Sequence, residues 1–232
     1  MTDIPIIVIS SSNVQTGKTT LALNLAAVLW SDGYDILLFA PHNKDIESFM
    51  QQREMLNKQS AVCLPMPQII DSISNIPEKQ EKSVIIADIP TVENGQYRKI
   101  FSMAHTLISM GNDVEDLSWD FSDSYMEIIW QAKKDIAARG IKYLNWIAML
   151  NNQENSDNEK ILILQEKAKK YGYRIAEPLK FRNAYKYWQN GYCTADMAKF
   201  RGIFKMSLED VYARREILKL TDFLWKMNKS AQ

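Results

Sequence analysis

The chain has 232 residues, of which 46% are hydrophobic and 24% charged, and its formal net charge is zero. This composition is typical of a single compact soluble domain, expected to cover residues 1–232, with a sizeable core. The sequence has no run of 18 uninterrupted apolar residues and no basic region ahead of its first apolar segment, so it predicts neither a membrane span nor a signal peptide and favours a cytoplasmic protein.

Charge is distributed unevenly along the chain. Residues 1–132 hold 8 basic and 17 acidic side chains, whereas residues 133–232 hold 20 basic and 11 acidic ones, which gives −9 and +9. Such asymmetry can indicate an anionic partner such as nucleic acid, but charges separated in sequence often mix on a folded surface, and both interpretations stay open. The two cysteines, Cys63 and Cys193, lack the spacing of metal ligands and are interpreted as free thiols.

Short apolar runs alternate with longer segments of helical period, a pattern typical of βαβ units. Nearly all the strand candidates are continuous apolar runs, as buried parallel strands require. The sequence therefore predicts an α/β fold, with a doubly wound, mostly parallel sheet flanked by helices. In chain order, the expected elements are strand 6–10, helix 18–31, strand 35–40, helix 45–58, strand 84–88, helix 96–104, strand 106–110, helix 125–139, strand 145–150, helix 158–171, a weaker strand 173–175, and helices 183–189 and 208–228.

The stretch "SSNVQTGKTT", residues 11–20, links the first strand to the first helix. Ligands of doubly wound sheets bind beyond the carboxyl ends of the strands, which is where this loop falls. Gly17, Lys18 and Thr19 match the end of the phosphate-loop motif G-x-x-x-x-G-K-[ST], in which backbone N–H groups and the lysine hold phosphates and the hydroxyl holds magnesium. Ser12 replaces the first glycine of the motif. An ordinary capped helix with an exposed lysine is the alternative.

A second motif supports the phosphate loop. "SVIIADIPT" is an apolar strand that ends in the carboxylate of Asp88, as in a Walker-B motif. We expect Asp88 to hold a magnesium ion opposite Thr19, directly or through water. The alternative is an aspartate that merely ends a strand.

These residues resemble the ParA/MinD family of deviant Walker ATPases, which are P-loop proteins whose loop reads roughly K-G-G-x-G-K-[ST]-T. "NVQTGKTT" is similar to a degraded copy of that loop, and "ADIPT" to the family's D-T-P segment. "SFMQQREMLNKQ" resembles an arginine-bearing helix of the MipZ group of division-plane positioning ATPases, and "MGNDVEDL" a loop of that group. "KYGYRIAEPLKFRNAYKYWQNGYCTADM" follows the group's pattern most closely, so the resemblance covers nearly the whole chain.

The resemblance implies ATP and Mg²⁺ as ligands and a homodimer that forms on ATP binding. It further implies a ParB-type or division-protein partner, and nonspecific DNA binding through basic residues of the C-terminal part. "WIAMLNN" is similar to the strand whose final asparagine meets adenine. The residues expected to bind the nucleotide are Ser12, Asn13, Gln15, Thr16, Gly17, Lys18, Thr19, Thr20, Asn151 and Asn152, and those expected at the metal are Thr19 and Asp88.

Two departures from the family pattern bear on catalysis. The family's signature lysine, which reaches the partner's phosphates across the dimer, falls on Asn13, an uncharged amide. The family's aspartates after the second strand align with "FAPHNKD", where Ala40 and Pro41 cannot take a proton. Because cations and water-positioning groups lower the barrier to phosphoryl transfer, we expect slow or absent hydrolysis and name no catalytic residue.

Three functions are compatible with the sequence. The first is an ATP-binding, dimerising switch in chromosome partition or division-site positioning, with weak Mg-dependent ATPase activity. The second is a nucleotide-independent pseudo-ATPase that serves as an interaction protein on the same fold. The third is a small-molecule-converting enzyme of the wider P-loop family.

Overall fold

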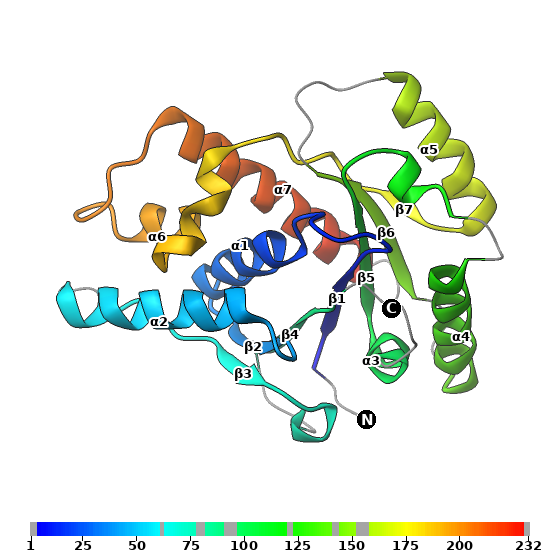
Figure 1. The fold of residues 1–232 in the computed structure, drawn as a ribbon, viewed down its shortest axis with the longest axis horizontal. Helices are drawn as coiled ribbons and strands as arrows, with labels where there is room; N and C mark the ends of the chain where they lie inside the picture. The colour runs from blue at the N-terminus through cyan, green and yellow to red at the C-terminus, as the bar shows by residue number, and fades with distance from the viewer. Residues whose placement is uncertain are drawn as a thin grey trace. The chain divides into compact units, whose positions relative to one another are not determined.

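A computed structural model describes residues 4–60, 63–77, 82–90, 97–119, 123–140, 144–151 and 158–229. Seven strands in these ranges form one sheet in the order β3-β2-β4-β1-β5-β6-β7, with helices packed against it (Figure 1). The β1–β5, β2–β3, β5–β6 and β6–β7 pairs are parallel. This order confirms the predicted α/β fold. The strands are β1 (Ile6–Ser10), β2 (Asp35–Phe39), β3 (Gln68–Ile70), β4 (Ser83–Asp88), β5 (Thr106–Gly111), β6 (Asn145–Leu150) and β7 (Arg174–Ile175).

Most predicted helices agree with the structure to within a residue or two. The α-helices are α1 (Lys18–Ser31), α2 (Lys44–Gln59), α3 (Arg98–Met103), α4 (Ser124–Ala138), α5 (Asn158–Tyr171), α6 (Thr194–Lys199) and α7 (Leu208–Lys229). The 3₁₀ segments are η1 (Ile73–Asn75), η2 (Glu115–Leu117) and η3 (Asn183–Asn190). The prediction of an α-helix over 183–189 was therefore wrong in type, because a stretch of about two turns barely separates a period of 3.6 from one of 3.0.

Backbone contacts divide the chain into two compact units, and each is described by itself. The first unit comprises Met1–Ile4, Thr19–Ile86 and Arg182–Gln232, and the second comprises Pro5–Lys18 and Ala87–Phe181. The single domain expected over residues 1–232 stays a prediction. No helix among the described residues is long and apolar enough to cross a membrane.

In the second unit, strands β1, β5, β6 and β7 build a fully parallel layer. Ser10 pairs with Ser109 at the carboxyl ends of β1 and β5. The hydroxyl of Tyr125, on α4, lies 2.6 Å from Oγ of Ser10 and 2.7 Å from Oγ of Ser109. Indole Nε1 of Trp146 donates to the same Ser109 oxygen at 2.8 Å. This buried network fixes the ends of two strands, from which the loops 11–17 and 112–119 leave.

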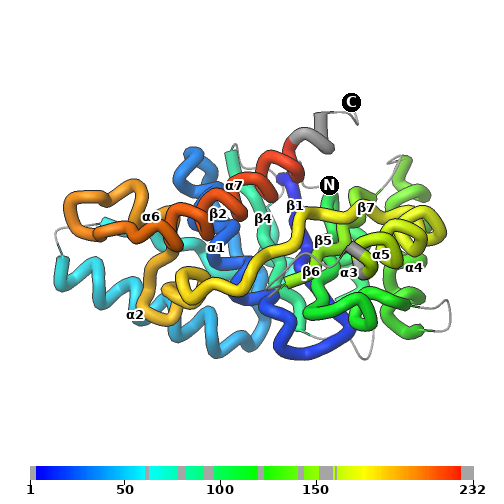
Figure 2. The backbone as a smooth tube through the Cα atoms, turned by 90° about the horizontal axis from the view of Figure 1, so that it is seen from above, coloured from blue at the N-terminus to red at the C-terminus, as the bar shows by residue number. Residues whose placement is uncertain are grey.

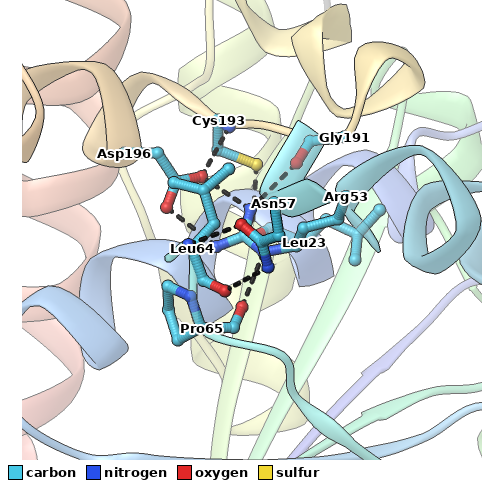
Figure 3. Close-up of polar contacts among 8 residues, drawn as sticks. All are labelled: Leu23, Arg53, Asn57, Leu64, Pro65, Gly191, Cys193 and Asp196. Atoms are coloured by element: carbon cyan, nitrogen blue, oxygen red, sulfur yellow. Dashed lines mark hydrogen bonds and ion pairs between the residues drawn. The ribbon is translucent and has the colours of Figure 1, made fainter. Parts of the chain in front are cut away.

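In the first unit, α1 is buried along almost its whole length, from Leu21 to Leu29. Helices α6 and α7 are in contact and lie next to each other in both views (Figure 1 and Figure 2). Arg53, on α2, points toward Asp196 of α6, and both side chains are almost fully buried (Figure 3). The arginine of the predicted α2 helix therefore belongs to the core of this unit.

Candidate functional site

The loop between β1 and α1 has two residues in the left-handed region, Gln15 at φ 56° and Gly17 at φ 85°. A Cβ atom on Gly17 would collide with the side-chain amide of Asn151. Gly17 is therefore required both for its backbone angle and for space. This backbone leads directly into Lys18, the first residue of α1, where unpaired N–H groups of a helix end favour anions.

Lys18 folds back over the loop. Its Nζ donates to Oγ of Ser11 at 2.8 Å and to the carbonyl of Asn13 at 3.3 Å. The hydroxyl of Thr16, which is buried, also donates to Oγ of Ser11, at 3.0 Å. Burial lowers the pKa of Lys18, and the negative charge of Asp88 opposes part of that decrease. The loop thus carries a cationic side chain, and the buried carboxylate of Asp88 favours its charged form.

A second loop, residues 112–119 after β5, holds the first one in place. The hydroxyl of Ser12 donates to the carbonyl of Asp116 at 3.2 Å, and Nε1 of Trp119 donates to Oγ of Ser12 at the same distance. Nδ2 of Asn13 donates to the Asp116 carboxylate. Nδ2 of Asn112 reaches the carbonyl of Gln15 at 3.4 Å. The serine that replaces the motif's first glycine is thus one of the residues that join the two loops, through two of the four hydrogen bonds described.

The sequence prediction missed Asp116 and Trp119. A strand order that makes β1 and β5 neighbours could have found them, because neighbouring parallel strands end at the same edge and bring their following loops together. "MGNDVEDL" was interpreted as a family segment without being placed beside the loop that precedes α1.

Asn151 is in contact with the loop and Asn152 lies outside the described residues. Nδ2 of Asn151 donates to the carbonyl of Thr16 at 2.9 Å. This bond positions Asn151 over the backbone of the phosphate loop. Its expected contact with adenine stays a prediction.

Thr19 and Thr20, in the first unit, are held by neighbours from that unit. Nδ2 of Asn43 donates to the hydroxyl of Thr19, and Nε1 of Trp188 donates to that of Thr20, both at 3.1 Å. Asn43 also caps α2, because its Oδ1 accepts from the backbone of Asp45 and Ile46. The metal pair Thr19 and Asp88 has one member in each unit, so this pair stays a prediction.

The aromatic residues of η3, His105 and the two cysteines have structural environments. Among the aromatic residues of η3, Tyr185 and Trp188 are buried in the core. Nδ1 of His105 accepts the backbone N–H of Ile6 at 3.1 Å, a structural contact. Cys63 is exposed and Cys193 buried, both as free thiols, as predicted.

The family model for ATPase MipZ matches residues 5–228 of the chain. The chain belongs to the MipZ family. The match covers β1 through α7, and with them the loop 11–20, Asp88 and Asn151. No curated protein matches the sequence.

This MipZ-family chain is similar in structure to several solved proteins. A plasmid partition protein from Borrelia burgdorferi B31 bound to AMPPNP has a TM-score of 0.56 and 13% identity, over 97% of this chain and 100% of that one. Apo McdA from Cyanothece has a TM-score of 0.56 and 16% identity, over 93% and 99%. MinD in the MinC:MinD cell division complex of Aquifex aeolicus has a TM-score of 0.54 and 14% identity, over 96% of each chain. At such identities the likeness shows the fold alone.

Proposed function

We propose that this MipZ-family protein is an ATP-binding switch in chromosome partition or division-site positioning. The observation that carries the proposal is the position of Lys18, whose Nζ donates to Ser11 and Asn13 in the loop that precedes α1. A partition protein bound to AMPPNP, a McdA–ATP complex and a MinC:MinD complex are among the chains of similar fold. Two of those proteins are bound to a nucleotide and one is in a complex with a partner protein, which is compatible with the proposal.

The residues present fit a magnesium nucleotide. The left-handed Gly17 lets the backbone turn tightly ahead of α1, and Lys18 supplies the cation that phosphates need. Thr19 and Asp88 offer a hydroxyl and a carboxylate, the oxygen ligands that Mg²⁺ prefers alongside phosphate. The ion would neutralise charge on the outer phosphates. The polypeptide would bind the phosphates, and Asn151 or Asn152 would be the adenine contact.

Hydrolysis by this protein is proposed to be slow or lost. Asn13, which aligns with the family's signature lysine, carries no charge, and its amide is bound to Asp116. Ala40, which follows β2 where the family has aspartates, is buried and apolar. A site that lacks the signature lysine and a water-positioning carboxylate loses terms that are large in phosphoryl transfer. The proposed switch therefore acts while ATP is bound, and slow hydrolysis would return it to the state without ATP.

Self-association and partner binding complete the proposal. We infer a cytoplasmic protein that dimerises on ATP binding and then engages a ParB-type or division protein, or nonspecific DNA through basic residues such as Lys199, Arg201 and Lys205. Arg201 and Lys205 are exposed, as DNA contacts must be. The nucleotide-independent pseudo-ATPase is the competing function, supported by the bond between Asn13 and Asp116.

The test is a thermal-shift and calorimetric titration with Mg-ATP, Mg-ADP and Mg-AMPPNP. Binding to the folded state alone at 100 times Kd stabilises it by about 2.7 kcal/mol. At about 2–4 °C per kcal/mol, this raises Tm by roughly 5–10 °C in a chain of this size. Lys18→Ala should abolish the shift, whereas Lys99→Ala, which removes an exposed lysine of α3, should keep it. No shift with the unmodified protein at millimolar nucleotide would instead establish the pseudo-ATPase.

A further inference from the structure

The first turns of α7 expose apolar side chains to solvent. Leu208, Val211 and Tyr212 have 67%, 46% and 44% of their surface exposed. Their spacing of three and four residues puts them on one face of the helix, and the opposite face holds Ala213 and Ile217, which are buried. The core of the first unit therefore does not account for the apolar residues of the outer face.

The turn that precedes α7 presents a further apolar residue. Ile203 has 52% of its surface exposed. The backbone N–H groups of Ile203 and Phe204 both donate to the carbonyl of Phe200, at 3.0 and 3.1 Å. The ring of Phe204 packs on that of Tyr192, with centroids 4.8 Å apart. The turn is thus fixed by its own contacts, and these contacts leave Ile203 at the surface.

Nearly all the exposed charges around these apolar residues are positive. In residues 199–219 the exposed acidic side chain is Glu209, whose Oε1 accepts the backbone N–H of Asn183 at 2.9 Å. Asp210 is buried, and Glu216 accepts from Nη2 of Arg182 at 2.6 Å. The exposed basic side chains of the same segment are Lys199, Arg201, Lys205, Arg215 and Lys219. Such a surface favours an anionic partner.

We propose that this surface binds an acidic segment of a partner protein that also contributes apolar side chains. We call it the α6–α7 surface, and it consists of Lys199, Arg201, Ile203, Lys205, Leu208, Val211, Tyr212 and Arg215. The inference deepens the proposed function, on which it rests, by naming the chemistry of the protein that the switch engages.

The apolar residues decide between the classes of anionic partner. DNA phosphates are bound by cations and polar groups, so exposed apolar side chains add little to nonspecific DNA binding. A protein interface has an apolar centre in which Tyr and Arg are enriched, and Tyr212 and Arg215 are of these types. An anionic lipid surface would repel the exposed carboxylate of Glu209, which directly follows Leu208. An acidic and apolar protein segment fits both the charge and the apolar face.

The experiment measures Kd for fluorescein-labelled synthetic peptides by fluorescence anisotropy, in the presence of Mg-AMPPNP. The probe is a peptide of repeated Glu-Glu-Leu-Leu. A Glu-Glu-Ser-Ser peptide has the same charge without the apolar side chains, and a Lys-Lys-Leu-Leu peptide has the opposite charge. We expect the first peptide to bind at least about tenfold more tightly than either of the others, because both kinds of contact are needed. Duplex DNA and vesicles of phosphatidylglycerol and phosphatidylcholine are titrated in parallel.

Two variants and two matched controls locate the binding. Leu208→Ser should raise Kd for the acidic peptide about tenfold, because it removes apolar surface that the peptide would bury. Leu162→Ser, which changes a leucine of α5 that is 60% exposed, should leave Kd unchanged. Lys205→Glu should raise Kd about fivefold at low salt and less at high salt, whereas Lys134→Glu, at an exposed position of α4, should not.

The outcomes separate this inference from the nucleotide site. If the acidic peptide does not bind a protein whose Tm rises with Mg-ATP, the inference is wrong and the nucleotide site stands. If the peptide binds as expected and no nucleotide raises Tm, the α6–α7 surface stands and the ATP-dependent switch fails. Equal effects of Leu208→Ser and Leu162→Ser would overturn the inference, as would binding of DNA or vesicles without binding of the peptide. Should Leu208→Ser not fold, as judged by circular dichroism, Val211→Ser carries the same expected increase in Kd.

Discussion

Arg53 and Asp196 form a buried ion pair in the first unit, and removing one partner of this pair is expected to be costly. The guanidinium donates to both carboxylate oxygens of Asp196, at 2.8 and 2.9 Å, and to the carbonyls of Pro65 at 2.6 Å and Gly191 at 3.0 Å (Figure 3). Asp196 also accepts the backbone N–H of Cys193 at 2.8 Å, which caps α6. One arginine thus links α2, the segment before β3, the end of η3 and α6.

Arg53→Met removes one partner and leaves a carboxylate that is almost inaccessible to solvent. Breaking a buried pair in this way costs about 3–5 kcal/mol, because the remaining charge is neither hydrated nor paired. At roughly 2–4 °C per kcal/mol for a chain of this size, Tm should fall by about 6–20 °C. Replacing both partners, as in Arg53→Met with Asp196→Leu, should cost less than the sum of the single changes, since no charge is left buried.

Urea unfolding followed by circular dichroism measures these free energies in each variant. Glu54→Gln is the control, because it breaks the exposed pair between Glu54 and Lys58 on the same helix, and it should leave the unfolding midpoint nearly unchanged. A loss of less than about 1 kcal/mol in Arg53→Met would refute the reasoning. Additive effects in the double variant would refute it as well, because the two side chains would then not interact.

Two further predictions concern titratable groups. Burial raises the pKa of Tyr125 to about 12, although its bonds to Ser10 and Ser109 act in the opposite direction. As the pH rises, the tyrosine therefore ionises first in the unfolded chain, so its contribution to the free energy of unfolding is complete below about pH 10 and is lost between about pH 10 and 12. Urea unfolding at pH 9 and 11 should show a smaller decrease in the free energy of unfolding for Tyr125→Phe than for the unmodified protein. An equal decrease would contradict the assignment. Cys63 is exposed, whereas burial raises the pKa of Cys193, so 5,5′-dithiobis(2-nitrobenzoate) should modify one thiol in the folded protein and the second only on unfolding. Rapid modification of both would show that Cys193 is accessible.

The sequence predicts the long elements because their apolar patterns are local. Strands β1 and β6 and helices α1 and α5 have the expected bounds. Strand β3 has three residues and α6 six, too few for a periodic pattern to identify them. In addition, α6 depends on Asp196, which is bound to Arg53, 143 residues earlier. Such an element is stabilised by a distant contact that no window of sequence contains.

In the candidate site, too, the residues of a local motif were predicted and the contacts between distant residues were not. Gly17 and Lys18 were identified from a short motif, and the structure brings them together with Thr16 and Asn151. The contact between Asn13 and Asp116 joins residues 103 positions apart. Its partner could be located only from the strand order and the exact course of the loop after β5. The sequence also did not predict the role of Ser12, which replaces the motif's first glycine, because the hydrogen bonds of Ser12 are made with residues of that second loop.

The hydroxyl of Tyr125 stabilises the strand ends from which the two loops of the candidate site begin. It bridges Ser10 and Ser109, the paired residues at which β1 and β5 approach their loops. The starting points of both loops are therefore fixed by a residue that belongs to neither of them. Substitutions within the loops, such as those that distinguish this chain from the usual phosphate-binding motif, can accumulate without altering the scaffold that carries them. A fold held in this way can outlast the activity for which its motif is known.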